Sequence, residues 1–350
     1  MKAKLLSLAA TFGEALDGKD LRGGRYARTA LGGLVMSAST LQGADLSGCD
    51  LREAVFDGCD FTGASFAGSN LRQAVFNRCV LDDVDLSACN LQGAVVSEAS
   101  MRGLRMTRSD LSNAALSKCR IEQGDVAECC FDSASFIECS MPDLKAPRTH
   151  WLYASLIGCT LTGISLHEAR LRRTVFARSP LPGHDFTGMD LEGCLFAELD
   201  MTGARFRGAR MKQVNFQNAT IAQVDLRGVD APQAVFAGAR GAQANFTGAR
   251  LPQALFTGAE LPQACFDQAD LTQCHFAGAK LPEARMVQAT LSYADFSGAD
   301  LRGVDARESR MFRTLLHRAD THGCRFTHRA EALETDPARD RAERWPADVR

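Results

Sequence analysis

The stretch Ala44-Asp45-Leu46-Ser47-Gly48 decides the fold, because the same five-residue pattern returns along most of the chain. It recurs at Ala269-Asp270-Leu271-Thr272-Gln273 and at Ala299-Asp300-Leu301-Arg302-Gly303. Counted in steps of five from Leu41 to Phe326, nearly every residue is Leu, Phe, Met or a close substitute. A period of five fits neither an amphipathic helix nor a plain strand. A fixed short period instead predicts a solenoid, in which successive coils stack on one another.

Each repeat predicts which of its residues face inward. The large residue at the centre and the small residue two positions earlier should lie on one side of a short extended segment, because side chains alternate along a strand. Ala44 and Leu46 should therefore point into the core, while Asp45 between them should face solvent. The two residues after the centre must turn the chain. Pro is frequent at the first of them and Gly at the second, which suits a tight turn whose second residue has positive φ.

This A-(D/N)-L-x-x pattern resembles the repeat of the pentapeptide repeat family, over about residues 39–328. The resemblance implies an all-β fold, a right-handed quadrilateral β-helix with four repeats in each coil, and roughly 14 to 15 coils for a chain of this length. We expect the β-helix to span residues 19–328 and a polar C-terminal tail to span residues 329–350.

An N-terminal capping helix is expected over residues 1–18, because a solenoid needs its ends covered. Its apolar face would consist of Leu5, Leu8, Phe12 and Leu16.

The repeat pattern degrades around residues 141–155. At the central position of the repeat, which elsewhere holds Leu or Phe, Trp151 is larger than usual and Ala146 is smaller. Leu144 and Thr149 replace small residues. These substitutions predict an irregular coil, which would be a natural hinge between two halves of the solenoid.

The net charge and the apolar content of the chain indicate which kinds of partner and which compartment to expect. The formal net charge of −2 and the pI near 6.4 favour neither a strongly basic nor a strongly acidic partner. No apolar run is long enough to span a bilayer, so we expect no membrane contact. We expect a cytoplasmic location because the placement of the cysteines, described next, favours reduced thiols.

The thirteen cysteines follow the repeat. All but Cys130 and Cys265 occupy the inward small position, where Cys acts as a small hydrophobic residue. No Cys-x-x-Cys pair occurs. We therefore expect reduced thiols, no zinc site and no cofactor.

One side of the predicted coil carries apolar residues at the outward position before the centre. They are Val55, Val75, Val95, Val175, Leu195, Val235 and Leu255. An apolar stripe along a soluble solenoid suggests a surface that binds a protein partner or a second copy of the chain. The alternative is that Val at these positions only reflects the preference of strands for β-branched residues.

A second side carries basic residues, among them Arg170, Arg210 and Arg250. Asp190 and Asp230 are interleaved with them, and exposed aromatic residues are lacking on this side. This arrangement is typical of a solvated face and argues against nucleic-acid binding.

The outward positions hold no paired carboxylates in a cleft, no Ser-His-Asp set and no glycine loop that opens a helix, so we do not expect an enzyme. We expect a non-enzymatic scaffold or adaptor for protein–protein interactions. The family resemblance implies two settings: some members accompany effectors of bacterial contractile secretion systems, and others mimic DNA and inhibit or protect DNA gyrase. The second setting is our alternative, but the near-zero net charge departs from the acidic surface of such mimics.

Overall fold

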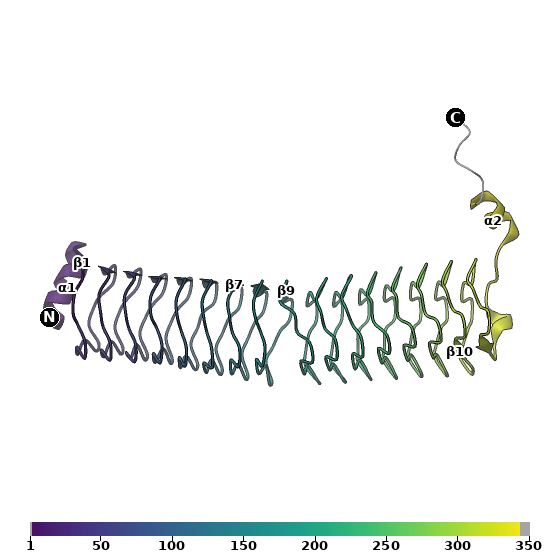
Figure 1. Cartoon of the computed structure of the whole chain (residues 1–350), viewed down its shortest axis with the longest axis horizontal. Helices are drawn as coiled ribbons and strands as arrows, with labels where there is room; N and C mark the ends of the chain where they lie inside the picture. The colour runs from purple at the N-terminus through teal and green to yellow at the C-terminus, as the bar shows by residue number, and fades with distance from the viewer. Residues whose placement is uncertain (1, 344–350) are drawn as a thin grey trace, which may run out of the picture. The chain divides into compact units, whose positions relative to one another are not determined.

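The computed structural model describes residues 2–343, which form a parallel β-solenoid of about 16 turns (Figure 1). Each turn takes twenty residues, because bridged residues of successive coils lie twenty positions apart, as in Asp45 with Ser65, up to the last bridge, where Leu315 pairs with Leu333. The predicted four repeats per coil and the all-β fold are thereby confirmed. The chain divides into two compact units, unit 1 (Met1–Pro180) and unit 2 (Leu181–Arg350).

Unit 1 contains a helix and a parallel sheet that forms one side of the solenoid. The sheet has nine strands in sequential order, and partners lie in register, as in Val55 with Val75. The elements are α1 (Ala3–Phe12), β1 (Ala15–Asp17), β2 (Val35–Ser37), β3 (Val55–Asp57), β4 (Val75–Asn77), β5 (Val95–Ser97), β6 (Ala115–Ser117), β7 (Ser135–Ile137), β8 (Ser155–Ile157) and β9 (Val175–Ala177).

Helix α1 is shorter than expected and buries a different face. It ends at Phe12, because Gly13 turns into the left-handed region at φ 67° and its N–H bonds to the carbonyls of Ala9 and Ala10. The buried residues are Leu6 and Ala9. Leu5, Leu8 and Phe12 are exposed, and Leu16 lies buried in β1. The expected helix over residues 1–18 was therefore wrong in its end and its face, because the first coil already begins at Ala15.

Unit 2 repeats the same twenty-residue coil through single bridges, from Asp185 with Arg205 onward. Its named elements are β10 (Asp305–Ala306), β11 (Arg325–Phe326), η1 (Arg329–Glu331) and α2 (Pro337–Glu343).

Part of the expected C-terminal tail belongs to the solenoid. Leu333 bridges to Leu315 as a last rung. Helix α2 contacts the preceding coil, since Glu343 and Asp340 lie 3.0 Å from His317 Nε2 and Arg318 Nε, respectively. This last rung and the early start at Ala15 explain why the solenoid has more turns than the expected 14 to 15.

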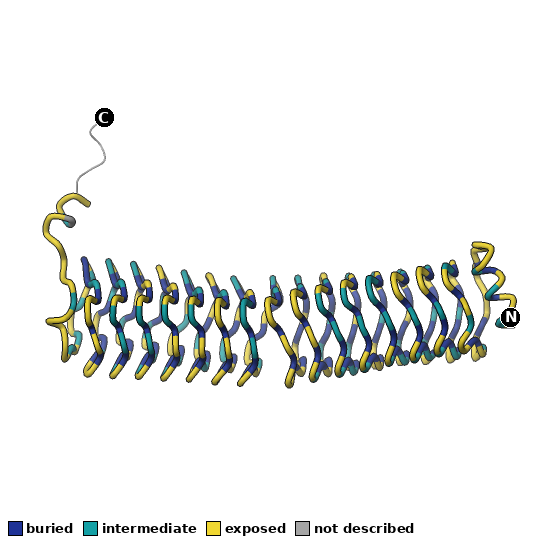
Figure 2. The backbone as a smooth tube through the Cα atoms, turned by 180° about the vertical axis from the view of Figure 1, so that it is seen from behind, coloured by how far each residue is buried: buried dark blue, intermediate teal, exposed yellow. Residues whose placement is uncertain are grey.

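The inward and outward positions are those that the repeat predicts. Buried and exposed residues alternate along every coil (Figure 2). Ala254 and Phe256 are fully buried, whereas Gln253 is exposed. The second turn residue has positive φ as expected, both at Gly43 (62°) and at non-glycine positions such as Gln253 (61°).

The coil around residues 141–155 is regular, contrary to our expectation. Its bridges continue on both sides, and Trp151 is buried with its ring stacked on Phe131 at 4.3 Å. The indole Nε1 donates to Thr149 Oγ1 (2.7 Å), which donates to the Ala146 carbonyl (2.7 Å). The small residue at 146 thus makes room for the large one at 151, and the polar groups satisfy each other.

Unit 1 ends at Pro180, not in the coil that we expected to be irregular. Its counterpart one coil earlier, Thr160, donates its N–H to the Cys139 carbonyl at 3.0 Å. Proline has no N–H and cannot make this bond.

Candidate functional site

Four valines are aligned on adjacent strands of unit 1. Val35, Val55, Val75 and Val95 begin β2 to β5 and pair directly with one another. Val35 and Val95 are 38% and 41% exposed, and the two valines between them are half-buried. We call these four residues the valine column. Val35 was missed in the sequence because the repeat is loose before residue 39.

The predicted stripe is interrupted after Val95. Ala115, Ser135 and Ser155 occupy the same position on β6, β7 and β8, so Val175 on β9 is separated from the valine column by three strands. The structure therefore brings Val55, Val75 and Val95 together but does not bring Val175 to them.

A polar column lies beside the valine column, at the third residue of strands β1 to β5. Ser37 Oγ donates to Asp17 Oδ1 (2.6 Å), and Asn77 Nδ2 donates to Asp57 Oδ1 (2.6 Å). Ser97 Oγ in turn donates to Asn77 Oδ1 (2.9 Å). These polar groups hydrogen-bond to one another, and the valines form the apolar part of this side.

The corresponding positions of unit 2 are more mixed. Leu195 and Leu255 are 38% and 37% exposed, and Val235 is half-buried. Asn215 bridges to Val235, and His275 and Asp295 follow Leu255. Asp295 therefore places a charged side chain in this column of unit 2.

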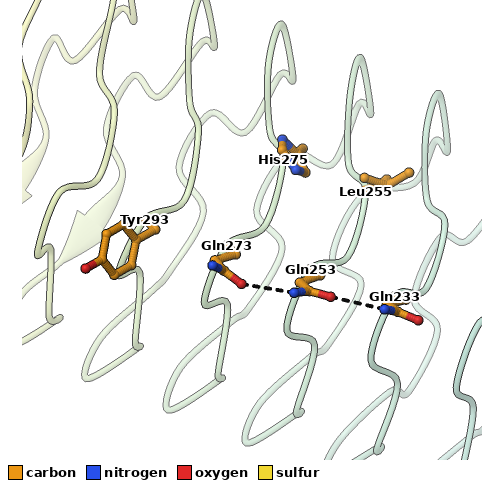
Figure 3. A pocket seen from close by; sticks show the side chains of 6 residues that line it. All are labelled: Gln233, Gln253, Leu255, Gln273, His275 and Tyr293. Atoms are coloured by element: carbon orange, nitrogen blue, oxygen red, sulfur yellow. Dashed lines mark hydrogen bonds between the residues drawn. The ribbon is translucent and has the colours of Figure 1, made fainter.

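A row of glutamines lies at the turn next to this side in unit 2 (Figure 3). The Nε2 groups of Gln213, Gln233 and Gln253 each donate to the Oε1 of the next glutamine, the last being Gln273, at 3.0–3.1 Å. Tyr293 takes the same turn position one coil later. A shallow groove of about 560 Å³ is lined by Gln233, Gln253, Leu255, Gln273, His275 and Tyr293. We missed this row in the sequence, although Gln recurs there every twenty residues.

Charges alternate along the outward columns of unit 2 and pair between coils. On the basic side Arg250 lies 2.8 Å from Asp230, and in another column Lys280 lies 2.8 Å from Glu260. This pairing supports the interpretation of the basic side as a solvated face.

The outward aspartates also fasten the turns. Asp45 Oδ1 accepts hydrogen bonds from Ser47 N (3.0 Å) and Ser47 Oγ (2.6 Å), which together lower the pKa of the Asp45 carboxyl. Asp225 instead forms a bidentate pair with Arg227 at 2.7–2.8 Å, which lowers the pKa of Asp225. These aspartates are thus bound to their own turns.

All thirteen cysteines are free thiols. Ten are buried, and Cys130, Cys265 and Cys324 are half-buried. Burial raises the pKa of Cys79 to about 12. Cys130 and Cys265 follow the prediction, whereas Cys324, next to strand β11, is more exposed than its inward position suggests.

Within residues 2–343, no group of three or more His, Cys, Asp and Glu side chains is arranged to hold a metal ion. Over the same described range, neither helix has the length and apolarity that crossing a membrane requires.

Comparison with solved structures found pentapeptide repeat proteins. HetL from the cyanobacterium Nostoc sp. strain PCC 7120, involved in heterocyst differentiation regulation, is 21% identical over 69% of this chain and 91% of its own, with a TM-score of 0.26. A trypsin-treated variant of QnrB1, a plasmid-mediated fluoroquinolone resistance protein, is 16% identical over 57% and 91%, with a TM-score of 0.32. Rfr23 from the cyanobacterium Cyanothece 51142 is 21% identical over 31% and 64%, with a TM-score of 0.20.

No curated protein matched the chain. The family model for pentapeptide repeats matches it in eight copies. The matched residues are 39–117 and 154–305, which make up more than half of the chain. The chain therefore belongs to the pentapeptide repeat family.

Proposed function

We propose that this protein is a non-enzymatic scaffold or adaptor that binds a protein partner through the valine column of unit 1. The observation that carries the proposal is the alignment of Val35, Val55, Val75 and Val95 on adjacent strands with their side chains partly open to solvent. Exposed contiguous apolar surface is costly in water and is typical of interaction sites.

The geometry of the sheet favours a flat contact. The strands of unit 1 pair in register from β1 to β9, so the outward residues form straight columns. The polar column beside the valines is already hydrogen-bonded within itself. A partner could therefore cover the valines without leaving these polar groups unpaired, which would otherwise cost about 1–3 kcal/mol each.

The test replaces two adjacent valines by aspartate. Val55→Asp combined with Val75→Asp should abolish a complex that the wild-type chain forms, measured by affinity capture and by light scattering for self-association. The matched control is Ser135→Asp with Ser155→Asp, which places the same pair of charges on adjacent strands of the same column. Thermal unfolding of both variants checks that they fold. A folded valine variant that keeps every partner would contradict the proposal.

The paired charges lend no support to the alternative of DNA mimicry, because a mimic of DNA must present unpaired negative charge. Acidic residues here face basic ones, as in Arg148 with Glu128 in unit 1 and Arg285 with Asp267 in unit 2. A DNA gyrase supercoiling assay with the purified chain tests this alternative directly, and we expect no inhibition or protection.

A further inference from the structure

The glutamine groove of unit 2 is chemically unlike the valine column. Its lining combines three primary amides, an exposed imidazole, one aliphatic side chain and one aromatic ring, without a carboxylate or a guanidinium (Figure 3). Such a surface has no fixed charge to attract a phosphate or an anionic polymer. It favours a ligand that is neutral and rich in hydroxyl groups.

The glutamine row keeps hydrogen-bonding capacity for such a ligand. A primary amide has two N–H donors and an oxygen with two lone pairs. Gln233 and Gln253 each use one donor and one acceptor within the row. Each therefore has a second donor and a second lone pair for a ligand hydroxyl, which can both donate and accept.

Tyr293 adds a held aromatic ring at the end of the row. Its side chain is 49% exposed, and its ring packs perpendicular to that of Phe312 at 5.5 Å between centroids. This contact restricts the ring on one side, so part of its conformational freedom is already lost before a ligand stacks on it. An open aromatic ring beside amides suits the apolar C–H face of a pyranose.

The spacing of the row distinguishes a sugar chain from a peptide. Successive amides lie one coil apart, about 4.8 Å for paired strands. A β-strand advances about 3.3 Å per residue and a polyproline II helix about 3.1 Å. Successive residues of either peptide therefore do not align with successive glutamines of the row. Each hexose of an extended β-1,4-linked chain advances by close to one rung.

Among the described residues of unit 1, 2–180, there is no equivalent platform. Tyr153 takes the same turn position there, but Arg173 covers its ring, with Cζ 5.5 Å from the centroid. Arg173 Nη1 also donates to the Tyr153 hydroxyl at 2.7 Å. The uncovered ring is thus a feature of unit 2, and Tyr153 provides a matched control.

From these observations we propose that the groove lined by Gln233, Gln253, Leu255, Gln273, His275 and Tyr293 binds a neutral, extended β-linked oligosaccharide. The sugar rings lie along the glutamine row, and one of them stacks on Tyr293. This site is separate from the valine column and does not depend on the proposed docking of a protein partner.

The experiment titrates the full chain with a β-1,4-linked glucose hexamer by calorimetry, with an α-1,4-linked hexamer as a control of ligand shape. We expect saturable binding of the β-linked hexamer with a Kd on the order of 1 mM or lower, and weaker binding of the α-linked one. Tyr293→Ala should weaken binding about tenfold or more, because the stacking contact is lost. Tyr293→Phe should retain it. Gln253→Ala should weaken it about threefold to tenfold.

Two control variants carry equivalent changes away from the groove. Gln268→Ala removes a glutamine from another row, where Nε2 donates to Gln288 Oε1, at a turn with the same positive φ. Tyr153→Ala removes the covered tyrosine. Both should bind the β-linked hexamer as the wild type does.

The proposal is overturned if the wild type shows no saturable binding up to about 10 mM, or if Tyr293→Ala and Gln253→Ala bind as well as the controls. Binding of an uncharged extended peptide in the same groove, with no binding of either hexamer, would also overturn it. Capture of a protein partner through the valine column is measured separately, so the failure of one proposal leaves the other standing.

Discussion

Units 1 and 2 have the same twenty-residue coil but differ in the side chains that form its core. In unit 2 one column of the core consists of phenylalanines that stack nearly parallel on one another at 4.6–5.2 Å between ring centroids. They are Phe196, Phe216, Phe236, Phe256, Phe276 and Phe296. The equivalent column of unit 1 mixes Phe56, Phe76, Val96, Leu116 and Phe136, and within it Phe56 and Phe76 stack at 5.1 Å.

Unit 1 instead balances volumes between neighbouring coils. Leu104 and Leu144 occupy small inward positions, and Gly124 lies between them. A Cβ atom at residue 124 would meet Leu144 Cδ1 at 3.3 Å and Leu104 Cδ2 at 3.4 Å. Trp151 and Ala146 are both buried and show a similar balance between two adjacent repeats of one coil. The core of a solenoid can therefore be filled in two ways. Either one residue type repeats in successive coils and stacks, or large and small residues alternate so that their volumes together fill the space, as close packing requires.

The largest expected effect comes from breaking the phenylalanine column. Phe256→Ala should lower the free energy of unfolding by about 3–5 kcal/mol, because it removes a buried ring that stacks on Phe236 and Phe276. Leu116→Ala at the matching position of unit 1 should cost less, since no ring stack is lost. Chemical denaturation, together with hydrogen exchange to assign the change to its unit, measures both. The comparison fails if Leu116→Ala is the more costly change.

A smaller effect should follow from filling the space at Gly124. Gly124→Val should destabilise unit 1 by about 1–3 kcal/mol, because the added methyl groups collide with the two flanking leucines. Adding Leu144→Ala should restore part of that loss, and a double-mutant cycle measures the coupling. Strictly additive effects would mean that the volumes of neighbouring coils are independent.

Acid should weaken both units to a similar degree. The paired arginines hold the pKa of Asp50 in unit 1 and Asp225 in unit 2 below the usual range, and that of Asp20 at about 2. A carboxyl whose pKa is lowered by folding stabilises the protein above its unfolded pKa, near 3.9, and this contribution is lost as pH falls through the folded value.

We therefore expect stability to drop between about pH 4 and pH 2. Asp225→Asn should remove part of that drop, about 0.2–1 kcal/mol for one such exposed pair. Denaturation at pH 5 and pH 3 measures it. An unchanged pH dependence in Asp225→Asn would contradict the assignment.

The smallest effect is expected at the outward turn residues. Gln253→Ala should change the free energy of unfolding by no more than about 0.5 kcal/mol, because the side chain is exposed. Gln73→Ala, at the matching turn of unit 1 where Gly93 follows, should change it less still, since Gln253 loses two amide hydrogen bonds. If Gln253→Ala proved as damaging as Phe256→Ala, the assignment of inside and outside would be wrong.

Sequence reasoning predicted the site less completely than the fold. It identified Val55, Val75 and Val95 as outward apolar residues on one side, and the structure aligns them on adjacent strands. It did not find Val35 or the row from Gln213 to Gln273, and it grouped Val175 with valines from which three strands separate it. The repeat pattern assigns each outward residue separately, whereas a surface depends on which residue of the next coil lies beside it.

The sequence by itself determined the coil, because a period of five places each centre and each small residue inward regardless of their neighbours. The tertiary structure decided how positions twenty residues apart meet. The coil at residues 141–155, which we expected to be irregular, is regular because the Trp151 ring stacks on Phe131 in the preceding coil. The tertiary structure also joined the glutamines, twenty residues apart in the sequence, into a hydrogen-bonded row. These outcomes depend on volumes and hydrogen bonds between coils, which exist only once the chain has closed on itself.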